Sequence, residues 1–232
     1  MSIRVCRIGI LVLGFAFVNA AIAGETAEEV SKKIAAASEK LNSFSAKVKT
    51  VTEMKQEGFS MVSTTNGTTE MLRKGDDFLL RTETKGTTET NVGGTTTKQE
   101  SSMLMISDGS YTYTVTEMAG MKSAYKTKIQ KSDLDPFKVW RDTAELKVLP
   151  DSSLDGRAVW VMEATPKEGQ MGQGKTVMYY DKESGQMLKM VAHTPEGKPM
   201  ATTTCSDIKV NEKITPDRFV FKAPPGVEVQ ER

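Results

Sequence analysis

The stretch KTVMYYDKESGQMLKMVAHTPEGKPMATTTCSDIKVNEKITPDRFVF, residues 175–221, decides the fold of this chain. Its apolar and aromatic residues come in the short runs VMYY, MLKMV and FVF, which are typical of strands. The segments DKESG and TPEGKP between them carry the Asp, Ser, Gly and Pro that favour tight turns. The stretch therefore predicts three antiparallel strands joined by two turns, and then a short final strand at residues 219–221. We expect the rest of the chain to extend this sheet.

The first residues predict an export signal that is not part of the fold. Arg4 and Arg7 precede an uncharged apolar run at residues 8–18, and a small-residue A-x-A pattern ends at Ala23. The run is shorter than the roughly 20 apolar residues that a membrane-spanning helix needs. We therefore expect residues 1–23 to be a cleaved signal peptide; an N-terminal membrane anchor is the alternative.

The part that follows the predicted cleavage site has the size of one domain. We expect residues 24–232 to form a single exported domain, because all-β domains reach this length as a unit. Their 29 basic and 30 acidic residues nearly cancel, which argues against a nucleic-acid partner. Cys205 is the one cysteine in this part, so it has no partner for an intramolecular disulfide. A domain of this size builds its core without one.

Residues 26–44 predict an amphipathic helix. Thr26 and Glu29 have the spacing of a capping box, in which two side chains satisfy free backbone N–H groups. Apolar residues then recur every three or four positions, at Val30, Ile34, Ala37, Leu41 and Phe44. We expect this stripe to pack on the sheet, and binding to a membrane surface is the alternative. From Ser45 the period changes to two, which is typical of a half-buried strand.

Two dipeptides and one biased segment predict turns. Asn66-Gly67 and Asp108-Gly109 each favour a two-residue hairpin turn. Residues 85–99, KGTTETNVGGTTTKQ, carry almost no large apolar side chain. We expect this segment to be an exposed hairpin extension or a mobile loop.

The predicted hairpin at residues 103–116 has two different faces. A two-residue turn at Asp108-Gly109 places Ile106 opposite Tyr111 and puts the aromatic and large aliphatic side chains on one face. Met103 and Met105 then lie on the other face. Farther along, residues 133–142, DLDPFKVWRD, predict a short helix that is either a lid or part of the core.

The chain carries no motif of a catalytic or metal site. His193 is the one histidine of the chain, and together with Cys205 it does not supply the set of ligands that zinc takes. The sequence contains no nucleophile elbow, phosphate-binding loop or dinucleotide fingerprint. We therefore predict no enzyme activity, no metal and no cofactor, and we expect Cys205 to be a buried structural residue. Methionine is abundant, which suits a surface for apolar ligands of varied shape; a methionine-rich core is the alternative.

Several segments resemble one known family. YDKESGQML at 180–188, IKVN at 208–211 and FVFKAPPGVEV at 219–229 resemble the C-terminal half of outer-membrane lipoprotein carrier proteins, the LolA-like family. MLMISDGSYTYTV at 103–115 resembles that family's "DG" hairpin, and LNSFSAKV at 41–48 resembles its opening helix and first strand. The threonine-rich segment and the glycine-rich link near residue 169 depart from the pattern and look like insertions.

The resemblance implies a fold and a function. The fold would be mainly β with a few helices (α+β), a half-open antiparallel β-barrel covered by helices. The function would be that of a periplasmic carrier, a monomer that holds lipoprotein acyl chains or another lipid in an apolar cavity for transfer to the outer membrane. Its partners would be these lipids and transient inner- and outer-membrane transport components. An envelope-stress sensor or regulatory domain of the same fold, which binds a protein partner, is the alternative.

We expect large apolar side chains of the predicted strands and of the short helix to line this cavity. The candidate lipid-binding residues are Met54, Phe78, Leu80, Leu104, Ile106, Tyr113, Phe137, Trp140, Trp160, Met162, Leu188 and Met190.

Overall fold

The computed structural model describes residues 25–75, 77–130, 137–167 and 174–232. The predicted signal peptide and the start of the predicted short helix, residues 133–136, lie outside the described residues. Within the described part of the chain, no helix is long and apolar enough to cross a membrane.

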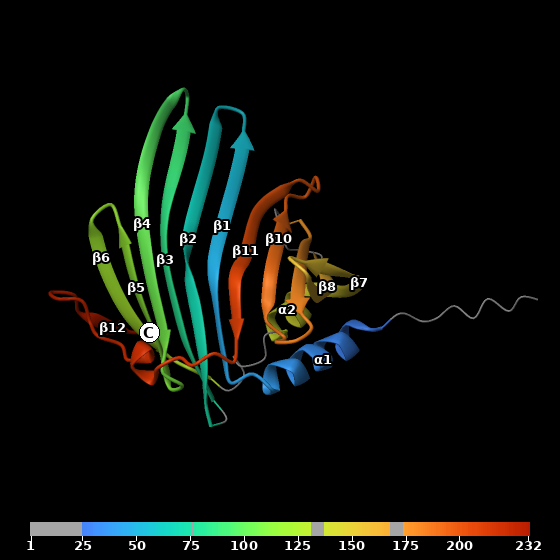
Figure 1. Cartoon of the computed structure of the whole chain (residues 1–232). Coiled ribbons are helices and arrows are strands. Elements are labelled where there is room, and N and C mark those ends of the chain that lie inside the picture. The colour runs from blue at the N-terminus through green and yellow to red at the C-terminus, as the bar shows by residue number, and fades with distance from the viewer. Residues whose placement is uncertain (1–24, 76, 131–136, 168–173) are drawn as a thin grey trace, which may run out of the picture.

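Twelve strands form one open sheet, which is the frame of the fold (Figure 1). The strand order is β12-β6-β5-β4-β3-β2-β1-β11-β10-β9-β8-β7, and all neighbours are antiparallel except β12 and β6. The strands are β1 (Ser43–Gln56), β2 (Phe59–Lys74), β3 (Asp77–Val92), β4 (Thr95–Ser107), β5 (Tyr111–Met118), β6 (Met121–Lys128), β7 (Ala144–Leu154), β8 (Arg157–Pro166), β9 (Thr176–Asp181), β10 (Met187–His193), β11 (Pro199–Val210) and β12 (Val229–Glu231). The mainly β class and the three-stranded meander, β9 to β11, are confirmed.

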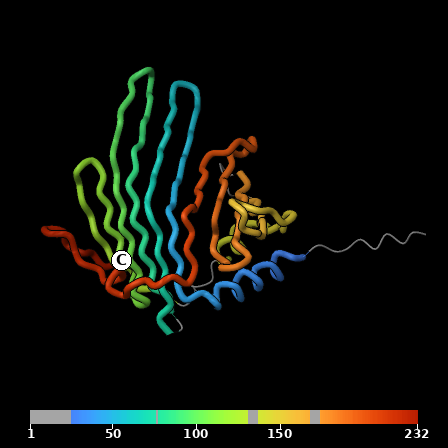
Figure 2. Tube along the Cα trace, in the orientation of Figure 1, coloured from blue at the N-terminus to red at the C-terminus, as the bar shows by residue number. Residues whose placement is uncertain are grey.

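The strands β1 to β4 form two long hairpins that extend beyond the rest of the sheet (Figure 2). The predicted turn at Asn66-Gly67 is wrong, because β2 continues through both residues and the first hairpin turns at Gly58 with φ +71°. Gly67 has another role, since a Cβ atom there would lie 2.0 Å from the carbonyl oxygen of Glu83. Glycine has no side chain, so its backbone can approach the neighbouring strand β3 this closely.

The threonine-rich segment 85–99 belongs to the second long hairpin. It is strand on both sides of a turn at Gly93-Gly94, and every residue from 93 to 99 is exposed. Of the two predicted alternatives, the exposed hairpin extension is therefore confirmed. The ladder bonds to β2 order this segment although it has almost no large apolar side chain to bury.

The hairpin of β4 and β5 has the predicted faces but not the predicted pairing. Ile106 lies opposite Tyr113, where the sequence predicted Tyr111. The loop is longer than two residues because the Asp108 carboxylate accepts hydrogen bonds from the backbone N–H groups of Ser110 and Tyr111, each at 2.8 Å. A shift by two residues keeps every side chain on its predicted face.

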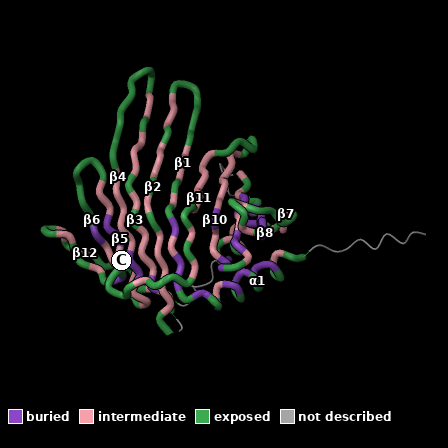
Figure 3. The backbone as a smooth tube through the Cα atoms, viewed as in Figure 1, coloured by how far each residue is buried: buried purple, intermediate pink, exposed green. Residues whose placement is uncertain are grey.

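Helix α1 (Ala27–Glu39) covers the β7–β10 end of the sheet, where buried residues gather (Figure 3). The predicted capping box of Thr26 and Glu29 is confirmed. The helix ends earlier than predicted, and the Arg73 guanidinium of β2 donates to the carbonyl oxygens of Ser38, Glu39 and Leu41 at 2.9 to 3.0 Å. A cation on the last free carbonyls stabilises a helix end.

The apolar stripe of α1 enters the main core cluster. Its buried members are Val30, Ile34, Ala37, Phe137, Ala144, Trp160, Met162, Ala164, Met178 and Tyr180. The predicted packing of this helix on the sheet is thus confirmed. Helix α2 (Lys138–Thr143) is shorter than the predicted one and adds the half-buried Trp140 to the same cluster.

The turn between β9 and β10 ties the sheet to α1. Its Gly185 has φ +68°, and a Cβ there would lie 2.4 Å from the carbonyl oxygen of Ile34. The buried Asp181 accepts hydrogen bonds from Arg157 at 2.8 and 3.0 Å and from the Ser184 hydroxyl at 2.6 Å. Burial raises the pKa of this carboxyl, but these hydrogen bonds outweigh burial and bring the pKa below its ordinary value.

The C-terminal segment crosses the base of the sheet. The predicted final strand at residues 219–221 is wrong, because Pro216–Phe219 form the 3-10 helix η2 and the closing strand is β12. Phe221 stacks on Tyr113 with ring centroids 4.4 Å apart, and Arg218 pairs with Glu70 at 2.8 Å. Proline at the start of the segment favours the tight helical turn over a strand.

Candidate functional site

The two faces of the sheet differ in charge. One face is called the uncharged face. On β1, β3 and β5 it comprises the even-numbered residues of 44–54, 80–92 and 112–118. On β2, β4 and β6 it comprises the odd-numbered residues of 59–71, 97–107 and 121–127. Not one of these side chains is charged, and most are Thr, Ser, Met or Gly. Every Lys, Arg and Glu within these spans lies on the opposite face, called the charged face.

Some hydroxyl groups of the uncharged face bond to one another across strands. The pairs are Thr50–Thr203 at 3.0 Å, Thr69–Thr82 at 3.2 Å, Ser63–Thr88 at 2.9 Å and Thr116–Ser123 at 2.8 Å. A hydroxyl with a partner in the protein loses less when water is removed from it. The threonine methyl groups meanwhile add apolar surface, so this face is less polar than its composition suggests.

A cleft of about 290 Å³ lies on the uncharged face. Its lining residues come from β1, β2, β3, β10, β11 and the turn before β10: Phe44, Val48, Thr69, Met71, Leu80, Thr82, Gln186, Met187, Leu188, Lys189, Met190, Thr203 and Cys205. On a flat sheet, β3 and β10 would be about 19 Å apart, four spacings of about 4.8 Å. The sheet therefore curls toward this face. The one cation at the cleft, Lys189, has its ammonium 5.4 Å from the Tyr179 ring centroid.

Cys205 lines the cleft and is partly buried. Its thiol lies 3.6 Å from the carbonyl oxygen of Met187, and burial raises the pKa of the thiol. A protonated thiol behaves as a small apolar group. Cys205 therefore suits an apolar lining better than a reactive role.

Three of the twelve predicted site residues meet in the cleft, namely Leu80, Leu188 and Met190. Met54 is on the same face near a hairpin tip, and Phe78 lies at the base with the Arg73 guanidinium 4.2 Å from its ring centroid. Four others, Phe137, Trp140, Trp160 and Met162, belong to the core cluster under α1. The remaining three, Leu104, Ile106 and Tyr113, are on the charged face.

The sequence analysis missed several cleft residues. Phe44, Val48 and Met71 line the cleft with Leu80, but Phe44 was assigned to the helix stripe. The sequence feature that could have identified these cleft residues is the absence of charged residues at every second position of β1 and β3. Large apolar size, which guided the selection, instead picked out residues of the core and of the charged face.

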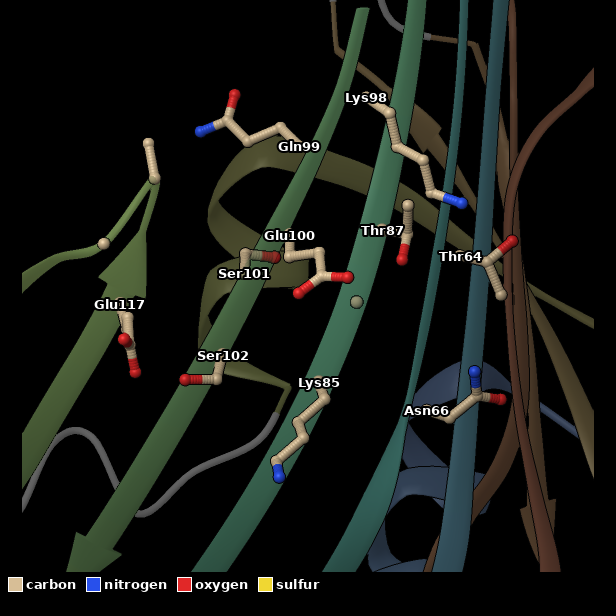
Figure 4. A pocket seen from close by; sticks show the side chains of 13 residues that line it. Thr64, Asn66, Lys85, Thr87, Lys98, Gln99, Glu100, Ser101, Ser102 and Glu117 are labelled. Atoms are coloured by element: carbon tan, nitrogen blue, oxygen red, sulfur yellow. The ribbon is translucent and has the colours of Figure 1, made fainter.

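A large depression lies on the charged face. It has a volume of about 770 Å³, and Figure 4 shows polar side chains around it, among them Lys85, Lys98, Glu100 and Glu117. Charged groups of both signs suit a polar partner and not an acyl chain. Volume alone therefore does not identify the site for an apolar ligand.

Comparisons with known proteins give structural similarity alone. No protein-family model matches the sequence, and no curated protein matches it. Similar solved structures include a LolA superfamily protein from Nitrosomonas europaea (11% identity, TM-score 0.29, 85% of this chain and 99% of that chain). Others are the lipoprotein LppX of Mycobacterium tuberculosis (10%, 0.40, 79% and 94%) and the MucA/MucB complex of Pseudomonas aeruginosa (15%, 0.42, 82% and 59%). At these identities and TM-scores, the similarity carries no conclusion about function. The LolA superfamily, which the sequence motifs resemble, is among the families named in these comparisons.

Proposed function

We propose that this chain is an exported, periplasmic binding protein that carries an acyl chain of a lipoprotein, or another lipid, to the outer membrane. The observation that carries the proposal is the cleft on the uncharged face, lined by Leu80, Leu188, Met190 and Cys205. Transfer of an acyl chain from water to an apolar site is favourable by about 0.8 kcal/mol for each CH₂ group that the site covers. The protein holds the chain by burial and needs no bond-making step.

The paired hydroxyls support the same proposal beyond the cleft. Where hydroxyls are paired, a long apolar ligand could cover them with a smaller loss of hydrogen bonds to water. A second groove of about 290 Å³ on this face includes Thr65, Thr84, Met103 and Met118. A ligand longer than the cleft would extend along this face toward the second groove, which lies beside Met118 near the β5–β6 turn.

The proposal is tested by the lipid content of the protein. The full chain is expressed with its N-terminal segment, purified from the periplasmic fraction without detergent, and identified by intact mass. Mass spectrometry of an organic extract is expected to detect lipid or acylated peptide near one molecule per protein. An extract equal to the buffer blank, together with no binding of a fluorescent fatty acid, would refute the proposal.

The depression on the charged face favours a second candidate function, a regulatory domain that senses envelope stress by binding a protein partner. Lys85, Lys98, Glu100 and Glu117 offer a peptide both signs of charge. Charge-reversed Lys85→Glu and Glu100→Lys variants would then lose a crosslinked partner in cells while they keep their lipid. Loss of lipid with unchanged crosslinking would favour the carrier alone.

A further inference from the structure

The hairpins at one end of the sheet carry exposed apolar side chains beside polar ones. The turns β1–β2, β3–β4 and β5–β6 point toward the same end because the strands form an antiparallel meander, although the β5–β6 turn stops short of the other two, with Met118 opposite Ser101 (Figure 1). Among the described residues, seven large hydrophobic side chains are exposed, and five of them are in these three hairpins. They are Met54 at 37%, Val62 at 45%, Val92 at 58%, Met118 at 54% and Met121 at 75% exposure. Such clustering marks an interaction surface, whereas scattered apolar residues would not.

Four of these side chains share the uncharged face. Met54 pairs with Met61, Phe59 pairs with Val92, and Met118 pairs with Met121. The turns themselves are small, and a Cβ atom added to Gly58, Gly93, Gly94 or Gly120 would meet no atom within 4 Å. Met54, Val92, Met118 and Met121 are here called the apolar tips, and each is partly covered by its neighbours, with 37 to 75% of its surface exposed.

Charge around these three turns is nearly balanced, since the exposed Lys55 and Glu57 beside the β1–β2 turn have opposite signs. Lys98 pairs with Glu89 at 3.7 Å, and Lys122 pairs with Glu117 at 3.4 Å, both on the charged face. An anionic lipid surface or a nucleic acid would call for a basic patch. Balanced charge beside exposed methionines instead complements the zwitterionic headgroups and the apolar layer of a neutral phospholipid surface.

We propose that the apolar tips dock this protein onto a zwitterionic phospholipid surface. Methionine is flexible and polarizable, so it enters the irregular boundary between headgroups and acyl chains without a fixed fit. The uncharged face continues from the tips to the cleft, so docking would bring the end of that face next to the layer that holds acyl chains. This role for the tips deepens the proposed function and rests on it, but membrane docking is measured separately.

The first test is flotation of the full chain, purified from the periplasmic fraction, with phosphatidylcholine vesicles. A triple variant carries Val92→Ser, Met118→Ser and Met121→Ser. Its matched control carries Val139→Ser and Val220→Ser, which remove side chains of similar exposure, 68% and 56%, away from the tips. We expect the wild type and the control to float equally and the triple variant to float at least tenfold less.

Each other result overturns the docking proposal. These results are a wild type that stays at the bottom of the gradient, a triple variant that floats like the wild type, and binding that requires anionic phosphatidylglycerol. Capture of a protein by the tips without vesicle binding would also overturn it. The lipid content of the triple variant separates the two proposals, because unchanged content leaves the carrier function standing when docking fails.

A second measurement locates the tips at the bilayer. Met121→Trp is mixed with vesicles that contain lipid brominated near the headgroup end of the acyl chain, and Val139→Trp serves as the control. We expect the brominated lipid to quench the tryptophan fluorescence of Met121→Trp more than that of the parent protein, and to quench Val139→Trp no more than the parent protein. Equal quenching of both variants would refute insertion of the tips.

Discussion

A carboxylate introduced on β3 should weaken binding of an acyl chain in the cleft. Thr82 lies on β3 within the cleft lining, and its hydroxyl is 3.2 Å from the hydroxyl of Thr69. The substitution Thr82→Glu would place a carboxylate among Leu80, Met190 and the other apolar lining residues. A short acidic side chain has less reach than lysine to return its charge to water.

The size of the effect follows from the cleft volume. At roughly 30 Å³ per group, the volume share of one water molecule, a cleft of about 290 Å³ admits about ten methylene-sized groups. Burial of ten methylenes at about 0.8 kcal/mol each gives an upper limit of about 8 kcal/mol, and about half of that remains because the cleft is open on one side. Lys189 also lines the cleft, but its ammonium lies 5.4 Å from the Tyr179 ring centroid. Unless Lys189 leaves this ring to pair with it, a carboxylate at position 82 costs several kcal/mol to dehydrate. A loss of about 3 kcal/mol corresponds to roughly 100-fold weaker binding.

The assay is titration of a fluorescent fatty acid, together with the lipid content of each purified variant. Thr82→Gln is the matched control for size, because it has the shape of glutamate without the charge. Thr87→Glu is the control for charge on the same strand, since Thr87 lies on the charged face. We expect both controls to bind within about threefold of the wild type, well under 1.4 kcal/mol. A Thr82→Glu variant that binds as the wild type does would refute the assignment of the cleft.

Three other residues give measurable predictions. Asp181→Asn should lower the free energy of unfolding at pH 7 by about 3 kcal/mol, because Arg157 loses its buried partner. Folding lowers the pKa of Asp181, so the carboxylate contributes its full stability above its unfolded-state pKa of about 3.9, and this contribution is lost as the pH falls through the folded-state pKa. In urea unfolding measured at several pH values, the variant should therefore lose less stability in acid than the wild type does. Gly67→Ala should destabilise by about 2 kcal/mol, because its Cβ would lie 2.0 Å from the Glu83 carbonyl oxygen, and an unchanged urea midpoint would contradict this. The Cys205 thiol, whose pKa burial raises, should react with maleimide more slowly than a free thiol, and a bound fatty acid should slow it further; equal rates with and without fatty acid would count against Cys205 as a cleft residue.

Local structure was predicted correctly where residues a few positions apart in the sequence determine it. The capping box at Thr26 and the turns of the meander depend on residues a few positions apart, and both are confirmed. The faces of the hairpin at residues 103–116 were also predicted correctly, because alternation in a strand survives an error in pairing by two residues.

The errors arose where distant residues decide the structure. Nothing near Asn66-Gly67 shows that β3 approaches Gly67 too closely for a side chain, so the pair was interpreted as a turn. The helix was predicted to continue to Phe44 because Arg73, which binds its last carbonyl oxygens, comes from β2. The site is a similar case, since curling of the sheet brings Leu80 and Met190 together across four strand spacings.

The composition of the uncharged face matters for a protein that must exist both empty and loaded. A face of Leu and Ile would bind an acyl chain more tightly, but when empty it would expose a continuous apolar patch that promotes aggregation. Threonines whose hydroxyls bond to one another, as Thr50 bonds to Thr203, tolerate water when the face is empty and lose little when a ligand covers it. The tightest apolar contacts are then needed only in the cleft. A face of this kind favours reversible holding over the strongest possible binding, which is what transfer of a lipid to a membrane requires.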